Sequence, residues 1–274
     1  MLYQIEPKTI VAACALCVLW LAEHRFPFFL EYWSGKSDRL RHDAKNLAVG
    51  MTNAVIATAL TGTLLVAVDV SSRDLGLLRW LSLPAIAATA VALVILDFWM
   101  YVWHRLNHAV PFLWRFHRMH HSDPAVDAST GVRFHTGEIL MSGLARAALL
   151  PLLGLSLWQM ALYDALLLPV VLFHHSNVRF PRWLDYGFTL LVVTPAMHRV
   201  HHSQWRPETD SNFASILPLW DRLFQSFRLR EDAHTIQLGL AEFEDQNWQT
   251  LWGMLRTPAA RSNRDTISRE QWSA

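Results

Sequence analysis

Long apolar segments restrict this chain more than any other feature of its sequence. A helix needs about 20 apolar residues to cross the core of a bilayer, and Leu47–Val70 and Leu83–Trp103 meet that length. Lys8–Ala22 is a shorter apolar run without the small-residue cleavage site of a signal peptide, so we expect it to be a membrane anchor. The composition agrees, because only 17% of the residues are charged, against about 25% in a typical soluble domain.

Two further apolar stretches, Ile139–Leu153 and Leu155–Phe173, are separated only by Gly154. Stretches joined this tightly predict a helical hairpin that dips into the membrane and returns. Basic residues set the orientation, because cytoplasmic loops carry the excess of lysine and arginine. The connection between Lys8–Ala22 and Leu47–Val70 is richer in basic residues than the connection between Leu47–Val70 and Leu83–Trp103. The first connection is therefore expected to be cytoplasmic, which also places the segment after Trp103 in the cytoplasm. The basic residues are Arg25, Lys36, Arg39, Arg41 and Lys45 in the first connection, and Arg73 and Arg79 in the second.

The remaining composition narrows the partners and the domain organisation. A net charge of +1 argues against a nucleic-acid partner, which requires a basic face. Cys14 and Cys17 lie inside an apolar run with no second cysteine pair, so we expect them to be inert. We divide the chain into N-terminal membrane helices (1–82), membrane helices with a histidine-rich cap (83–258) and a flexible tail (259–274). Within the cap, prolines predict short helices: Pro181, Pro195, Pro207 and Pro218.

Histidines gather in three short motifs. The third span ends in HRLNH, and the hexapeptides HRMHHS and HRVHHS begin at His117 and at His198. Residues spaced i, i+3 and i+4 lie on one face of a helix, so each motif directs its imidazoles the same way and the three faces can converge on a small volume. The motifs supply eight imidazoles: His104, His108, His117, His120, His121, His198, His201 and His202.

Imidazole is the commonest side-chain ligand of metal ions near neutral pH. Eight imidazoles exceed the need of one ion and suit two adjacent ions. Nitrogen ligands suit iron, zinc, copper or nickel, the zinc hydrolase motif HExxH is absent from the sequence, and a bis-histidine haem leaves most of the imidazoles unexplained. A metal-dependent hydrolase and a non-catalytic metal-binding or transport protein stay open. A transporter would carry charges deep within several spans, however, and we expect almost none beyond Asp97.

The order and spacing of these motifs on a multi-span chain resemble the fatty acid hydroxylase/sterol desaturase superfamily. The resemblance covers about residues 83–255 and rests on HRLNH, HRMHH, RFHTGE, HSN, TPAMHRVHH and TDSNFASILPLWDRLF. It implies that the eight histidines are catalytic metal ligands and that His135 and His175 are further ligands. Two positions depart from the family pattern, with Thr136-Gly137 where a proline is usual and Gln225 where a glycine is common. His174 lies where the pattern is looser and is not carried over.

The resemblance implies a membrane-bound, O2-dependent enzyme with two iron ions that hydroxylates or desaturates a fatty acyl, sterol or related lipid. We expect an all-α fold of multi-span membrane helices with a cytosolic, histidine-rich helical cap. No cytochrome, flavin or ferredoxin motif is visible, so electrons would come from a separate ferredoxin, or from a b-type cytochrome with its reductase. For the location, we expect a bacterial inner membrane rather than the endoplasmic reticulum.

Metal-bound histidines normally donate their second N–H to a carboxylate or a carbonyl group. Asp97 precedes His104 by seven residues on the same helical face, so it either orients a ligand or is an interfacial residue that snorkels. Asp210 and Asp221 could equally cap turns, and Glu138 follows the RFH segment. The histidines far from the motifs, which we expect at the surface, are His24, His42 and His234.

Overall fold

The computed structural model describes residues 7–30, 32–33, 35–71 and 74–261, so most of the predicted tail lies outside the described residues. The described chain is helical, and its extended pairings are two isolated β-bridges, which confirms the all-α prediction. The α-helices are α1 (Pro7–Arg25), α2 (Lys36–Ala57), α3 (Thr63–Ser71), α4 (Leu77–Trp80), α5 (Ala85–Ala109), α6 (Pro111–His121), α7 (Thr136–Leu153), α8 (Leu157–His175), α9 (Arg182–Phe188), α10 (Pro195–His201), α11 (Arg206–Thr209), α12 (Leu219–Leu223) and α13 (Leu251–Arg256).

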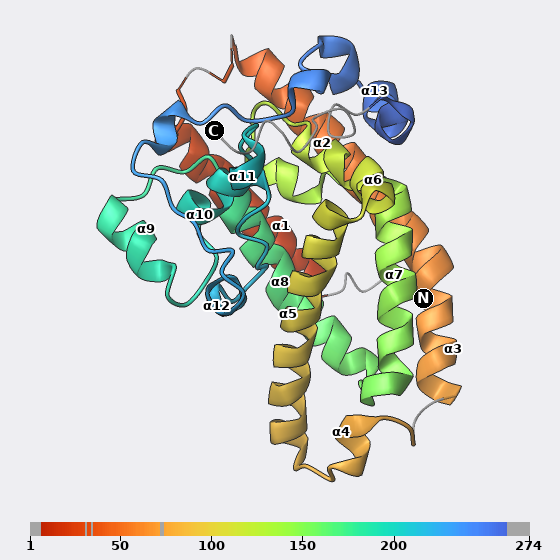
Figure 1. Ribbon diagram of the computed structural model, residues 1–274. Coiled ribbons are helices and arrows are strands. Elements are labelled where there is room, and N and C mark those ends of the chain that lie inside the picture. The colour runs from red at the N-terminus through yellow and green to blue at the C-terminus, as the bar shows by residue number, and fades with distance from the viewer. Residues whose placement is uncertain (1–6, 31, 34, 72–73, 262–274) are drawn as a thin grey trace, which may run out of the picture.

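Four helical segments of the described chain are long and apolar enough to cross a membrane, and they contain the spans and the hairpin predicted above. They are Lys36–Ser71, Ala85–Ala109, Thr136–Leu153 and Leu157–His175. The first joins α2 to α3 through the π-helical turn η1 (Thr58–Gly62). In Figure 1, α3, α5 and α7 reach into the lower part of the picture, with the short α4 at the bottom, and α2 and most of the other short helices lie in the upper part. The predicted N-terminal anchor forms α1, whose place in a membrane stays a prediction.

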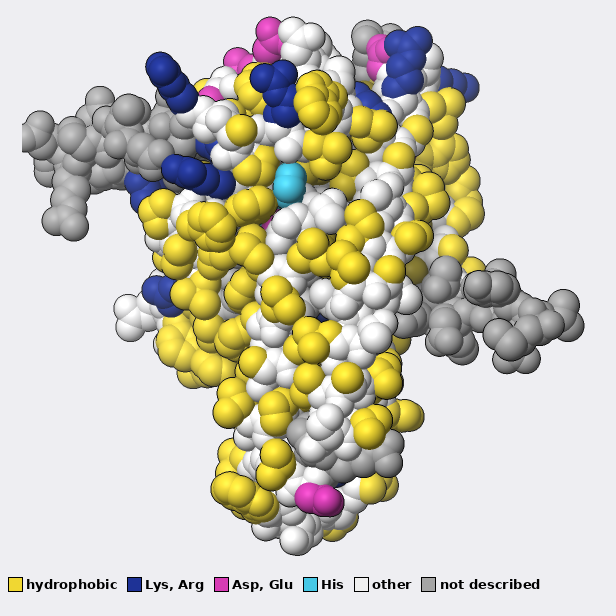
Figure 2. Space-filling model, turned by 90° about the vertical axis from the view of Figure 1, so that its right-hand side faces the viewer, with side chains coloured by type: hydrophobic (Ala, Val, Ile, Leu, Met, Phe, Trp, Pro, Cys, Tyr) yellow, Lys and Arg dark blue, Asp and Glu magenta, His cyan; other side chains and the backbone are white. Residues whose placement is uncertain are grey.

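The surface changes character between the two ends of the molecule (Figure 2). Over the lower part of the face shown, hydrophobic side chains predominate and charged ones are sparse. Lysine and arginine side chains gather toward the upper end, where the short helices lie. This distribution is what a protein with lipid around its lower helices requires, because charged side chains are expensive in the hydrocarbon core.

Gly154 makes the turn of the hairpin between α7 and α8. Its φ of 70° lies in the left-handed region that favours glycine. Gly76 approaches it so closely that a Cβ at residue 76 would lie 2.0 Å from the Gly154 nitrogen. A capping box then starts α8, because the Ser156 hydroxyl accepts from Gln159 N and the Gln159 side chain accepts from Ser156 N. The sequence therefore fixes both the stop and the restart of this hairpin.

The prolines of the cap stand at the starts of its short helices, as predicted. Pro181 and Pro218 are the N-cap residues of α9 and α12, and Pro195 and Pro207 lie in the first turns of α10 and α11. A proline is tolerated there because the first N–H groups of a helix have no partner within that helix. The chain can thus change direction often enough to fold the second HxxHH motif back over the membrane helices.

Charged residues within the spans are more numerous than we expected from the sequence. Arg146 of α7 and Asp164 of α8 form an ion pair at 2.7 Å. Asp69 accepts a hydrogen bond from the Leu157 backbone N–H at 3.1 Å. The expectation of almost no charge beyond Asp97 was therefore wrong. The partners come from different helices, so no single apolar run shows them as pairs.

The helix that contains the start of the predicted span Leu47–Val70 begins earlier, at Lys36. Its early turns are buried on one side, and His42 is only 7% exposed. His42 Nε2 donates to the Asp123 carboxylate at 2.9 Å, which explains the burial and shows that the surface prediction for His42 was wrong. His24 and His234 are exposed, as predicted.

Candidate metal centre

Nine histidine side chains meet in two adjacent groups. Within each group, one ring nitrogen of every residue lies within 4.8 Å of the others. Two rings from different groups, those of His121 and His202, stack with their centroids 4.5 Å apart. The first group is His104, His108, His117, His121 and His201, and the second is His120, His175, His198 and His202. The structure thus brings together nine of the ten predicted ligands and leaves out His135.

The repeated HxxHH motif divides its histidines between the groups in opposite ways. On α6, the outer pair joins the first group and the middle histidine, His120, joins the second. On α10 and its C-cap, the outer pair joins the second group and the middle histidine, His201, joins the first. In a helix of 3.6 residues per turn, positions i and i+4 are about 40° apart, while i+3 is displaced to one side. Each copy of the motif can therefore give two histidines to one group and one histidine to the other.

Hydrogen bonds at Nδ1 direct three Nε2 atoms of the first group inward. Each bond is accepted by a backbone carbonyl or a carboxylate oxygen, which carries no proton to donate. The N–H therefore lies at Nδ1, and a lone pair is left at Nε2. Among the described residues, these buried Nε2 atoms have no hydrogen-bond partner. A buried lone pair without a partner is costly, and a metal ion is what this arrangement fits. The bonds run from His104 to Phe213 O (2.9 Å), from His117 to Glu138 Oε1 (2.8 Å) and from His201 to Ser211 O (2.7 Å).

In the second group, four Nε2 atoms face one another. His175 Nε2 lies 3.0 Å from those of His120 and His198, and 3.3 Å from that of His202. His175 donates from Nδ1 to the Val171 carbonyl at 2.7 Å, so its Nε2 carries a lone pair. Nitrogens bound tetrahedrally at 2.0–2.1 Å would lie about 3.3–3.4 Å apart. The observed separations are close to the edges of such a tetrahedron.

Burial keeps the imidazoles of the cap in the neutral form that binds metals. For five of the grouped histidines outside the spans, burial, followed by repulsion from neighbouring imidazoles, lowers the pKa well below its usual value of 6.5. They are His120, His121, His198, His201 and His202.

Two of the four predicted carboxylates contact histidines directly. Glu138, in the first turn of α7, accepts from His117, and Asp210 lies 3.3 Å from His108 Nδ1. Asp221 acts one step further away, because it accepts from the backbone N–H groups of Phe213 and Ala214 at 2.8 and 2.9 Å. It thereby fixes the Phe213 carbonyl that receives the His104 N–H.

Asp97 contacts none of the nine histidines in the described structure, and it does not snorkel either. It is 2% exposed and accepts hydrogen bonds from Tyr163 Oη at 2.8 Å, Trp220 Nε1 at 2.8 Å and Leu217 N at 3.2 Å. Both sequence interpretations were wrong. Seven residues of helix rise about 10 Å, which is too far for a short carboxylate side chain to reach His104. Asp97 joins α5, α8 and the start of α12.

Two further histidines near the centre have other surroundings. His135 is the N-cap of α7, where its Nδ1 accepts from Gly137 N at 2.9 Å and its Nε2 lies 3.2 Å from the Leu255 carbonyl. Both of its nitrogens are therefore engaged by the backbone. His174 is buried, and its ring centroid lies 4.0 Å from that of His198, but it belongs to neither group.

Several supporting contacts could not be recognised in the sequence. Asn107 donates to Glu138 at 3.2 Å, and its position inside HRLNH was the one available signal. The Phe134 ring stacks on His120 with a centroid distance of 4.4 Å and an interplanar angle of 10°. The backbone acceptors at Phe213 and Ser211 leave no signal in side-chain identity.

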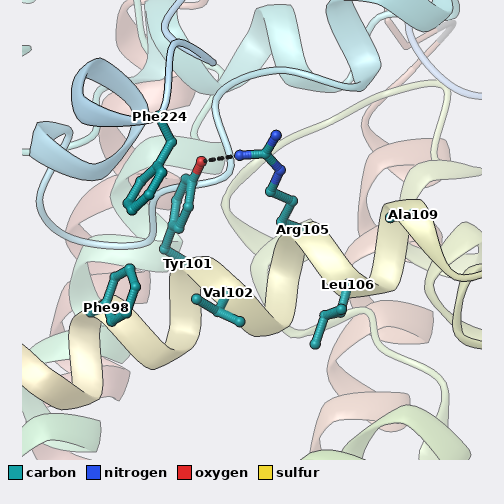
Figure 3. Close-up of a pocket in the computed structure, with 7 residues that line it drawn as sticks. All are labelled: Phe98, Tyr101, Val102, Arg105, Leu106, Ala109 and Phe224. Carbon is teal, nitrogen blue, oxygen red and sulfur yellow. Dashed lines mark hydrogen bonds between the residues drawn. The ribbon is translucent and has the colours of Figure 1, made fainter.

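A surface pocket of about 270 Å³ lies along α5 (Figure 3). Phe98, Val102 and Phe224 make its wall apolar, and Arg105 donates to the Tyr101 hydroxyl at 3.0 Å at one end. None of the nine histidines lines this pocket. It therefore does not mark the place where a substrate carbon would meet the centre.

The fold and the centre define a class of protein: all-helical, with four potential membrane spans and two adjacent groups of histidines. Residues 89–226 match the model of the fatty acid hydroxylase family, and the chain belongs to that family. Ornithine lipid hydroxylase OlsE of Rhizobium tropici is 34% identical over 53% of this chain and 43% of its own length. Human alkylglycerol monooxygenase is 30% identical over 50% of this chain and 29% of its own. Fatty acid hydroxylase vlmA of a Lecanicillium species is 30% identical over 64% of this chain and 51% of its own.

The chain therefore spans about half or less of the length of these relatives. No solved structure matches it at a significant level. The family assignment rests on the sequence match, and the arrangement of the histidines comes from the structure described here.

Proposed function

We propose that the two histidine groups hold two iron ions and that the chain is a membrane-bound, O2-dependent enzyme that oxidises a C–H bond of a lipid. The observation that carries this proposal is the set of nine imidazoles in two adjacent groups, with lone pairs directed inward. The three relatives named above are a lipid hydroxylase, an alkylglycerol monooxygenase and a fatty acid hydroxylase. Their names favour oxygen insertion over desaturation.

The five histidines of the first group would hold one ion and the four of the second group the other. His135 is not assigned as a ligand, because the backbone engages both of its ring nitrogens. When bound, two iron ions with O2 supply an oxidant strong enough for an unreactive C–H bond.

The protein's own groups hold the ligands in place. Glu138 and Asp210 accept the Nδ1 protons of His117 and His108, which fixes the ring orientations and strengthens the imidazoles as donors. The backbone carbonyl of Phe213, positioned by Asp221, does the same for His104. Burial of the histidines keeps bulk water away from the centre.

The membrane geometry supports a lipid substrate. His108 lies in the last turn of α5 and His175 in the last turn of α8, both of which are potential spans. The centre would then lie at the membrane surface, within reach of an alkyl chain. The lysine and arginine distribution favours the cytoplasmic side. Our proposal takes the membrane to be a bacterial inner membrane and the electron donor to be a separate ferredoxin, or a b-type cytochrome with its reductase.

The test combines lipid analysis with metal analysis. Lipids of cells with and without the gene are compared under 18O2, and the detergent-purified protein is assayed for metals. We expect a product heavier by one labelled oxygen atom and about two iron ions per chain. A single tightly held zinc ion without oxygen consumption would overturn the proposal in favour of a hydrolase.

A further inference from the structure

A third group of potential metal ligands lies apart from the histidine centre. It consists of His42 and Asp43 on α2 and Asp127, the N-cap of the 3-10 helix η2 (Ala128–Val132). Their ligand atoms lie within 4.8 Å of one another, and all three residues are at least nine-tenths buried. None of them belongs to the histidine motifs.

The separations within this group are long for hydrogen bonds. His42 Nδ1 lies 3.4 Å from Asp43 Oδ1 and 3.5 Å from Asp127 Oδ2. N–H···O hydrogen bonds are normally 2.7–3.2 Å long, and one N–H cannot point well at two oxygens. Nitrogen and oxygen ligands of a tetrahedral ion at 2.0–2.2 Å would lie about 3.3–3.6 Å apart. Both nitrogen–oxygen separations therefore match those of ligands of one ion, and the two carboxylates lie within 4.8 Å of each other.

His42 is oriented for such a role. Its Nε2 lies 2.9 Å from both carboxylate oxygens of Asp123, so the N–H at Nε2 is used and Nδ1 can offer a lone pair. A carboxylate behind an imidazole is the usual support of a histidine that binds a metal ion. The competing description is an imidazolium held among carboxylates, with a proton at Nδ1 as well. Burial lowers the pKa of His42, but Asp123 and Asp127 together raise it well above its usual value, so a metal ion would have to displace the Nδ1 proton.

Asp127 supplies the independent observation. Its Oδ1 accepts from the Ser129 backbone N–H and hydroxyl at 2.9 and 2.7 Å. Its Oδ2 is buried and lacks a well-formed hydrogen bond among the described residues, because His42 Nδ1, which faces it, lies 3.5 Å away. Among those residues its one ion-pair contact is with His42. Burial raises the pKa of the Asp127 carboxyl, and the nearby His42 opposes this shift.

None of the nearby guanidinium groups of the described residues forms an ion pair with Asp127. Arg39 binds Glu23 at 2.5 Å and is 3.7 Å from Asp43, and Arg133 is 3.7 Å from Asp123. An excess of negative charge therefore stays close to Asp127. A divalent cation would compensate it where no guanidinium reaches.

We propose that His42 Nδ1, Asp43 and Asp127 bind a third metal ion, a divalent first-row transition metal in a zinc-type tetrahedral site with water as the fourth ligand. Of the three ligands, His42 lines a polar pocket of about 380 Å³, the side from which an ion would have to enter. The ion would tie α2 to the segment that follows the first HxxHH motif. It would have a structural role separate from the oxidation chemistry.

Asp127→Asn is the sharpest test, because asparagine keeps the cap oxygen and replaces only the oxygen that lacks a partner. The variant is made in the full chain and also in a His120→Ala/His201→Ala background, where the histidine centre is disabled. Chelator-stripped proteins are dialysed against Zn2+, and bound zinc is counted per chain. In both backgrounds we expect Asp127→Asn to bind one zinc ion fewer, and Co2+ to lose the visible absorption of a tetrahedral site.

Asp43→Asn should reproduce this loss, and His24→Ala, which removes an exposed histidine, should not. Zinc should also raise the melting temperature of the His120→Ala/His201→Ala protein but not that of its Asp127→Asn derivative. Equal zinc content with and without Asp127→Asn, in folded proteins, would overturn the site and leave the imidazolium description. Because zinc is also counted in the protein whose histidine centre is disabled, failure of the di-iron proposal would not change this result.

Discussion

Glu138 offers a direct test of how the protein holds its metal ligands. Its Oε1 accepts from His117 Nδ1 at 2.8 Å and from Asn107 Nδ2 at 3.2 Å, and the residue is 4% exposed. Among the described residues, Oε2 accepts no hydrogen bond. In Glu138→Gln, the amide oxygen can keep both contacts while the NH2 group takes the place of Oε2. The substitution therefore removes the charge and leaves the geometry.

The magnitude follows from the role of the carboxylate. Mutation of a group that supports a metal ligand typically costs about 10–100-fold in metal affinity or activity, which corresponds to about 1.4–2.7 kcal/mol. In Glu138→Gln this cost would come from the lost negative charge behind His117. Glu138 also lies in the first turn of α7, where a negative charge stabilises the helix by about 0.3–1 kcal/mol. We therefore expect a small decrease in the free energy of unfolding and a larger loss of iron.

The assay measures iron per chain, the rate of iron transfer to a chelator, and turnover. Glu231→Gln is the matched control, because Glu231 is an exposed carboxylate. We expect Glu138→Gln to lose iron about 10–100-fold faster than the control. Wild-type iron retention and turnover in Glu138→Gln would refute the role assigned to the carboxylate.

Four more substitutions separate metal ligands from structural residues. His120→Ala and His201→Ala, one from each group, should each abolish turnover and lower the iron content while the protein stays folded and membrane-inserted; unchanged turnover would count against the two-ion centre. Asp97→Asn should lower the free energy of unfolding by about 1–3 kcal/mol, because buried donors lose their acceptor. Iron per chain should stay at the wild-type value. Iron loss without a change in melting temperature would instead mean that Asp97 supports a metal ligand. His135→Ala should lower the melting temperature through loss of the α7 cap and leave iron bound, and a stoichiometric loss of iron would make His135 a ligand after all.

The sequence predicts those parts of the fold that depend on local pattern. Apolar length gives the spans, Gly154 gives the hairpin turn, and prolines give the starts of the cap helices. The motif spacing predicts which histidines share a helical face. These features depend on residues within a few turns of one another, where helix geometry leaves few alternatives.

Contacts between distant segments could not be predicted in the same way. The partners of Asp97 lie 66 to 123 residues away, and His42 meets Asp123 across 81 residues. Asp97 looked like a supporting group because it shares a face with His104. Two residues on one helical face point in the same direction, but they can still be far apart along the helix axis. Only the packing of α8 and α12 against α5 decides what the carboxylate touches.

The reciprocal use of HxxHH makes the two histidine groups depend on the same pair of helices. The first group needs two histidines of α6 and one of α10, and the second needs one of α6 and two from α10 and its C-cap. A rotation or shift of either helix would therefore misplace ligands of both groups at once. The helices are held by different contacts: α10 through Met197 in the core with Tyr101 and Phe213, and α6 through Arg133, which donates to the Met119 carbonyl. Both sets of contacts must form before either group is complete, so assembly of the two sites should be cooperative.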